Sequence, residues 1–120
     1  MMATANVRTA IQVLKGRIGG SAVALVSRGG QVMAAELPPE VSAETFSIMC
    51  ATIYGAAVTA NAELGRAPPE RIAIPGNDAI TMIVRSGSRA VLVGVVDPGS
   101  DLLEVERELA KFADLLQLNG

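Results

Sequence analysis

A chain of 120 residues, half of them hydrophobic, can fill one core and is too short for two, so we expect a single domain over residues 1–120. The net charge of −2 and the near absence of aromatic residues (one tyrosine, two phenylalanines, no tryptophan) argue against nucleic-acid binding, which needs cations for phosphates and rings for bases. Without histidine and with one cysteine, the sequence excludes histidine metal sites, Ser–His and Cys–His nucleophile pairs and intramolecular disulfides.

The N-terminal segment lacks the charged start, apolar run and cleavage signal of an export sequence. No apolar run approaches the ~20 residues of a membrane-spanning helix. We therefore expect a cytoplasmic protein that contacts neither membrane nor nucleic acid.

The first third of the chain reads as a helix followed by a hairpin. Apolar residues recur at helical spacing over residues 6–16, which predicts a helix capped by Asn6 and ended by Gly16 and the glycines after it. Residues 21–27 are apolar at consecutive positions, which indicates a strand covered on both faces. After a Gly-Gly turn, residues 31–37 predict a less apolar strand near an edge of the sheet.

The longest predicted helix covers residues 42–66, begins at Ser42 as its cap and has very little polar surface. A bulky apolar face, which should pack on the sheet, contains Phe46, Met49, Cys50, Ile53, Ala57, Ala60 and Leu64. The opposite face is small and smooth, as a close contact with a second copy of the helix requires. The residues expected near that contact are Ile48, Ala51, Gly55, Val58, Thr59 and Ala62.

Three strands and a final helix complete the chain. Residues 71–74 predict a short strand stopped by a Pro-Gly turn, and residues 79–85 and 89–96 predict a second hairpin. Asp101 is the expected cap of the last helix, which has one apolar stripe and a charged remainder. The stripe consists of Leu102, Val105, Leu109, Phe112 and Leu116.

The order of these elements and three long strings resemble the Roadblock family, the dynein-light-chain-related domain also found in bacterial MglB-like regulators. The strings are GGSAVALVSRGGQVMAAEL, AAVTANAELGR and AITMIVRSGSRAVLVGVVDPGSDLLEVERELAKFADLL. The resemblance implies an α/β sandwich (α+β) of the Roadblock, longin and profilin type. Its five-stranded antiparallel sheet would have the order 2-1-5-4-3, with the long helix on one face and the two terminal helices on the other.

The resemblance also implies a non-enzymatic function. Family members pair through the central helix and the third strand, and they scaffold or regulate small Ras-like GTPases without a cofactor or catalytic residue of their own. The strand residues placed at the dimer contact in this way are Arg71, Ile72, Ala73 and Ile74. We therefore expect a homodimeric adaptor that binds such a GTPase and scaffolds it or modulates its GTP hydrolysis.

Two groups of polar residues are candidate contacts for the GTPase. On the paired central helices they are Thr52, Glu63 and Arg66. In the implied sheet, Arg28, Arg85 and Arg89 collect at one end, where they could hold an acidic partner or a phosphate through bidentate contacts. The alternative is that these arginines are simply solvated at the ends of strands.

Other chemistry finds little support in the sequence. Neither Lys15 nor Lys111 stands in the Gly-Lys-Ser/Thr string of a phosphate-binding loop, so the chain is not itself a GTPase. Cys50 reads as a small buried hydrophobe, and the carboxylates of the last helix as a solvated face. A scaffold subunit of a heteromeric complex and a small-molecule sensor domain remain as alternative functions.

Overall fold

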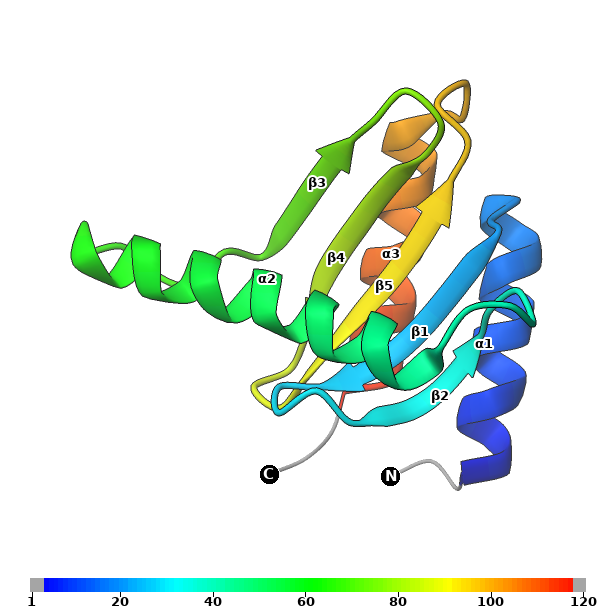
Figure 1. The fold of residues 1–120 in the computed structure, drawn as a ribbon, viewed down its shortest axis with the longest axis horizontal. Coiled ribbons are helices and arrows are strands. Elements are labelled where there is room, and N and C mark those ends of the chain that lie inside the picture. Colours follow the sequence, from blue (N-terminus) through cyan, green and yellow to red (C-terminus); the bar gives the residue numbers. More distant parts are fainter. Residues whose placement is uncertain (1–3, 118–120) are drawn as a thin grey trace.

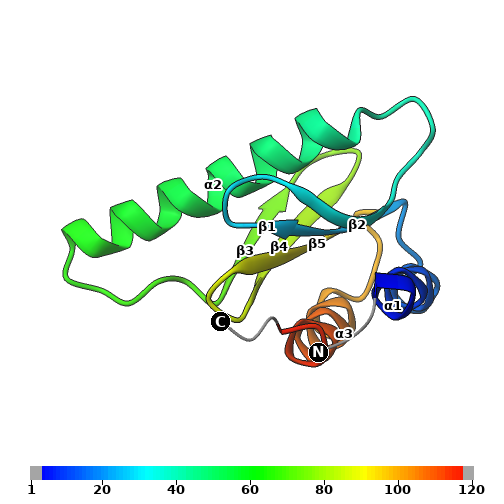
Figure 2. The ribbon, with the colours of Figure 1, turned by 90° about the horizontal axis from the view of Figure 1, so that it is seen from below.

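The computed structural model describes residues 4–117. Its five strands form one sheet in the order β2-β1-β5-β4-β3, and all neighbouring strands are antiparallel. One long helix, α2, crosses one face of the sheet, and α1 and α3 cover the other (Figures 1 and 2). The expected fold class and strand order are confirmed. The elements are α1 (Thr4–Ile18), β1 (Ala22–Ser27), β2 (Val32–Glu36), α2 (Ala43–Glu63), β3 (Arg71–Pro75), β4 (Ile80–Ser86), β5 (Ala90–Val96) and α3 (Leu102–Leu115).

The consecutive apolar residues of β1 and β5 are explained by the central place of these strands in the sheet. β1 lies between β2 and β5. Its register with β5 runs from Ala22 opposite Val95 to Ser27 opposite Ala90. Nearly every residue of β1 and β5 is buried, because helices cover both faces of these strands. β2 and β3 form the two edges and are more exposed.

The sheet separates two hydrophobic clusters, because alternate residues of each strand point to opposite faces. The larger cluster lies under α1 and α3 and includes Ile11, Leu14, Leu25, Leu92, Leu109 and Phe112. The smaller cluster lies under α2 and consists of Ala24, Val26, Cys50, Ala51, Tyr54, Ile83, Val91 and Val93. The α2 side therefore holds the smaller part of the core, built largely from small side chains.

The first helix is longer than the sequence pattern predicts. α1 begins at Thr4 and runs through Gly16 to Ile18, so the expected cap at Asn6 and the expected end at Gly16 are wrong. Ile18 is buried in the larger cluster, and this packing favours continuation of the helix past Gly16. Gly19, with a φ of +62°, ends the helix in a conformation that a residue without Cβ adopts without strain.

The other two helix starts follow the prediction. The side chain of Ser42 accepts a hydrogen bond from the backbone N–H of Thr45 at 3.2 Å. The Asp101 carboxylate does the same for the N–H of Glu104, also at 3.2 Å. Both caps satisfy a donor that would otherwise lack a partner in the first helical turn.

α2 faces the sheet with a different set of side chains from the predicted one. Its buried residues are Ser47, Cys50, Ala51 and Tyr54. Met49 and Ile53, which were expected on the sheet, are 52% and 38% exposed. Small or apolar side chains occupy almost every flank of this helix, so periodicity alone does not single out the buried one. The C-terminal part of α2 extends past β3 and beyond the edge of the sheet (Figure 1).

Candidate interaction surface

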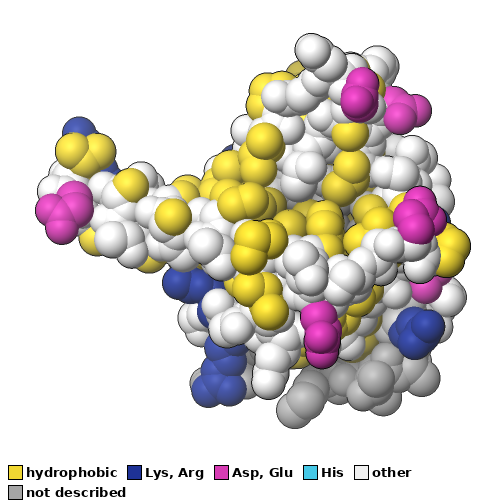
Figure 3. All heavy atoms as spheres, in the orientation of Figure 1, with side chains coloured by type: hydrophobic (Ala, Val, Ile, Leu, Met, Phe, Trp, Pro, Cys, Tyr) yellow, Lys and Arg dark blue, Asp and Glu magenta, His cyan; other side chains and the backbone are white. Residues whose placement is uncertain are grey.

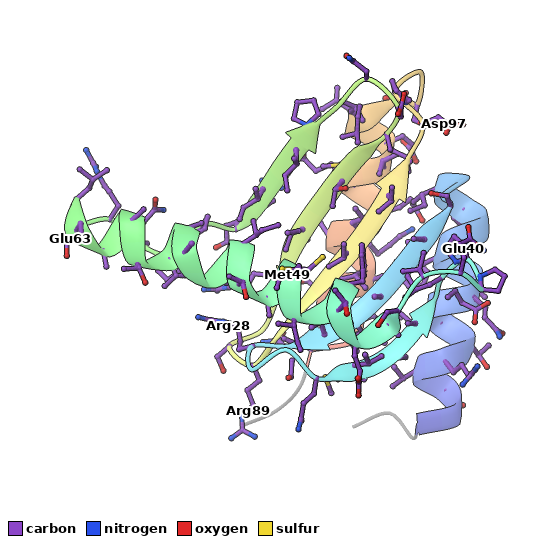
Figure 4. All side chains as sticks on the ribbon, viewed as in Figure 1. Arg28, Glu40, Met49, Glu63, Arg89 and Asp97 are labelled. Carbon is purple, nitrogen blue, oxygen red and sulfur yellow. The ribbon has the colours of Figure 1, made fainter. Side chains whose placement is uncertain are left out.

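An exposed apolar surface spans one flank of α2 and the neighbouring edge strand. It is formed by Met49 and Ile53 of α2 with Ile72 and Ile74 of β3, and we call these four residues the apolar surface. The register places Ile72 opposite Ile83, which lies in the cluster under α2, so both β3 isoleucines point to the α2 side of the sheet. Figure 3 shows hydrophobic side chains gathered over this region, and Figure 4 shows Met49 directed from α2 toward the uncovered strands.

The edge of β3 borders the apolar surface. β3 is hydrogen-bonded to β4 on one side only, so its other side presents backbone groups with no strand beside them among residues 4–117. Unpaired strand edges are templates for pairing with another chain. An apolar face and an open strand edge therefore meet at one border of this molecule.

The predicted β3 contacts do not all lie on this surface. Arg71 and Ala73 alternate with the two isoleucines and point to the opposite face of the sheet. The Arg71 guanidinium forms an ion pair of 3.0 Å with Glu106 of α3. This pair ties β3 to α3, so Arg71 supports the position of the edge strand from behind.

The predicted small face of α2 divides into two parts. Ala51 is 9% exposed and Val58 packs partly against the cluster under α2, so both face the sheet of their own copy. The residues along the flank that faces away from β3 are Ile48, Gly55, Thr59 and Ala62. Ile48 shows that this flank faces the β1–β2 turn near the start of α2. A Cβ added at Gly30 in that turn would lie 3.3 Å from Ile48 Cα.

The three predicted arginines do come together in space. The Arg28 N–H donates to the Arg89 carbonyl at 2.8 Å, which joins the turn after β1 to the turn before β5. Arg85 of β4 lies opposite Val91 of β5, two residues after Arg89, and forms an ion pair of 3.9 Å with Glu70. Figure 4 shows Arg28 beside the middle of α2 and Arg89 farther from the helix, both beyond the end of the sheet. We call Arg28, Arg85 and Arg89 the arginine patch.

Tyr54 is the residue at this site that the sequence reasoning missed. Its ring is fully buried, its hydroxyl donates to the Pro69 carbonyl at 2.8 Å, and the Arg28 guanidinium lies 4.9 Å from the ring centroid. Burial raises the pKa of Tyr54, although the positive charges of Arg85 and Arg28 act in the opposite direction. A single tyrosine within an alanine-rich helix is the signal that could have drawn attention to it.

The polar candidates on α2 lie apart from the arginine patch. Thr52 is exposed, but its hydroxyl donates to the Ile48 carbonyl at 2.7 Å within the same helix. Glu63 and Arg66 are exposed near the far end of α2, and Figure 4 shows Glu63 at that tip, well separated from Arg28. A partner that touches both groups must therefore extend along the helix.

Residues 14–96 match the Roadblock/LC7 domain. The chain belongs to the Roadblock/LC7 family. The uncharacterized protein MJ1340 of Methanocaldococcus jannaschii is 36% identical over 100 residues, which cover 83% of this chain and 85% of that protein. Myxococcus xanthus MglB superposes with a TM-score of 0.90 at 19% identity, covering 97% of this chain and 88% of that chain. A structure of MglB with a tetrameric arrangement gives a TM-score of 0.87 at 21% identity, covering 97% and 89%.

The other reactive groups of this Roadblock/LC7 domain serve its packing. Cys50 is buried, and burial raises the pKa of its thiol to about 11, so the thiol stays protonated and unreactive at neutral pH. Within residues 4–117, no cluster of three or more Cys, Asp or Glu side chains is arranged to hold a metal ion. No helix in that range combines the length and apolarity needed to cross a bilayer.

One carboxylate of α3 departs from the solvated face expected for it. Glu108 is 8% exposed and lies between Arg17 of α1 at 3.3 Å and Lys111 at 3.2 Å. Hydrogen bonding from Lys111 is the largest cause of a lowered Glu108 pKa, which Arg17 lowers further against the opposing effect of burial. Arg17 also lies 5.8 Å from the Phe112 ring centroid, so this group joins α1 to α3.

Proposed function

We propose that this chain is a homodimeric Roadblock/LC7 adaptor, acting as one domain over residues 1–120, that binds a small Ras-like GTPase and scaffolds it or modulates its GTP hydrolysis. The observation that carries the proposal is the meeting of the apolar surface with the open edge of β3. A single copy leaves Met49 and Ile74 52% and 39% exposed beside a strand with no partner. Exposed apolar groups rimmed by polar residues are typical of protein contacts.

A second copy of the chain satisfies both features at once. Antiparallel pairing of two β3 strands about a two-fold axis extends the sheet from one copy into the other. The same axis brings the Met49 and Ile53 flanks of the two α2 helices toward each other. The part of α2 that extends past the sheet, where Leu64 is 75% exposed, then lies over the partner. The tetrameric arrangement of an MglB structure similar to this chain supports self-association.

This proposal moves the dimer contact on α2 from one flank to the other. The sequence reasoning placed Ile48, Gly55, Thr59 and Ala62 at the contact. Ile48 of this flank lies against the β1–β2 turn, whereas Met49 on the other flank is directed toward the uncovered strands. The contact we propose is therefore the apolar surface together with the backbone edge of β3.

The paired α2 helices offer the surface on which a GTPase docks, with Thr52, Glu63 and Arg66 at its outer side. Membership of the Roadblock/LC7 family, whose fold is regulatory, and similarity to MglB support this role. The proposed adaptor has no active site, so any effect on hydrolysis arises by ordering groups on the GTPase itself.

Two measurements test the proposal. Sedimentation of the purified chain should give a stable dimer; a monomer would contradict the homodimer, and a tight complex only with a different subunit would favour the heteromeric scaffold. GTP turnover of small Ras-like GTPases from the same organism should change when the chain is added, or a stable complex should form. Neither binding nor a rate change with any of them would overturn the GTPase role.

A further inference from the structure

We propose that the arginine patch is a docking site for an acidic segment of the protein partner. This inference rests on the proposed function, since the partner is the small GTPase. It adds a location and a chemistry that the apolar surface does not supply. The patch lies at the other border of α2, beyond the end of the sheet (Figure 4).

The guanidinium of Arg28 is held in place before any partner arrives. It stacks on the Tyr54 ring at 4.9 Å, and the ring itself is fixed by burial and by the 2.8 Å hydrogen bond to Pro69. The backbone bond between Arg28 and Arg89 fixes the spacing of the two turns. Rigid donors lose less conformational entropy on binding than free side chains do.

Two of the three arginines in the patch have no ion-pair partner in the described part of the chain. Within residues 4–117, neither Arg28 nor Arg89 forms an ion pair, whereas Arg85 forms a long one of 3.9 Å with the exposed Glu70. A chain with 12 acidic and 10 basic residues has enough carboxylates to pair every arginine. Figure 3 shows the basic side chains together beside α2.

The chemistry of the patch favours carboxylates of a protein over a membrane or a nucleic acid. Membrane attraction takes clusters of about four to eight lysines and arginines, whereas this patch has three arginines and no lysine. Its base is also recessed, since the Arg85 side chain is only 36% exposed. The Arg28 guanidinium, held over the Tyr54 ring, suits the planar, bidentate geometry of Asp and Glu side chains.

The test compares charge reversal inside and outside the patch. Arg89→Glu changes an exposed turn residue, and Arg28→Glu removes the stacked guanidinium. The matched control is Arg8→Glu, which makes the same change of charge on α1, at the other face of the sheet. Each variant is titrated with the small GTPase that the wild-type chain binds, at low and at physiological salt, and its thermal unfolding is measured to confirm that it is folded.

We expect Arg89→Glu and Arg28→Glu each to weaken GTPase binding by about tenfold or more, with Arg8→Glu unchanged and the wild-type affinity falling as salt rises. If all three variants bind the GTPase as tightly as the wild-type chain does, this inference is overturned and the proposed function is not. A wild-type chain that binds no small GTPase would overturn the proposed function and the inference with it. Binding of phosphatidylserine vesicles that Arg89→Glu abolishes would assign the patch to a membrane instead.

Discussion

The guanidinium of Arg28 lies 4.9 Å from the centroid of the Tyr54 ring, and the hydroxyl of the same tyrosine donates to Pro69 at 2.8 Å. The tyrosine thus joins the turn after β1 to the loop before β3, across the width of α2. One buried side chain connects the arginine patch with the strand that forms the edge of the sheet.

Replacing Tyr54 should separate its two roles. Tyr54→Phe keeps the buried ring and loses one hydrogen bond, so we expect the free energy of unfolding to fall by about 1 kcal/mol. Tyr54→Ala also removes the ring and leaves a cavity, and the loss should be about 3 to 5 kcal/mol. Urea unfolding of the two variants measures both values, and equal losses would show that the ring contributes nothing beyond its hydroxyl.

A pair of substitutions decides which flank of α2 forms the dimer. Ile53→Glu places a carboxylate within the apolar surface and should split the dimer, because a charge would be buried without a partner. Gly55→Glu, two residues further on, should leave it intact, because Gly55 lies on the flank that faces away from β3. The variant should also fold, since a Cβ built at Gly55 meets nothing within 4 Å in the same copy. Sedimentation measures both. A dimer that survives Ile53→Glu and separates with Gly55→Glu would restore the contact expected from the sequence.

The stability of the domain should depend on pH through Glu108. Its pKa is lowered below the usual 4.5 in the folded state, so its contribution to stability is present above about pH 4.5 and is lost as the pH falls through the lower folded value. Urea unfolding of the wild type should show this loss between neutral and acid pH. The Glu108→Gln variant should be less stable than the wild type at neutral pH, and its free energy of unfolding should fall less on acidification. Identical pH profiles for the two proteins would contradict this role.

Ser47 is the buried hydroxyl whose removal should stabilise the protein. Its Oγ is fully buried under α2 and has no hydrogen-bond partner among the described residues. Ser47→Ala removes this unsatisfied group and places a stronger helix former in α2, so the free energy of unfolding should rise by about 1 kcal/mol. Thermal or urea unfolding measures the change, and a clear loss of stability would show that the hydroxyl has a partner in solution.

Much of the fold could be predicted because its signals are local. Consecutive apolar residues indicated the central strands, the Gly-Gly turn indicated the first hairpin, and Ser42 and Asp101 indicated the starts of two helices. The resemblance to the Roadblock family supplied the strand order, which local patterns do not contain. Of the glycines predicted to end α1, Gly16 does not end it and Gly19 does, because tertiary packing of Ile18 outweighs the low helix propensity of Gly16.

The sequence by itself determined which segments are helices and strands and that α2 has almost no polar flank. Only the tertiary structure decided which flank of α2 is buried. Tyr54 and Cys50 turn to the sheet and Met49 and Ile53 do not, because the direction in which a helix faces depends on the shape of the layer beneath it. The arginine patch likewise exists only in the folded chain. Arg28 and Arg89 are far apart in the sequence, and pairing of β1 with β5 places their turns side by side.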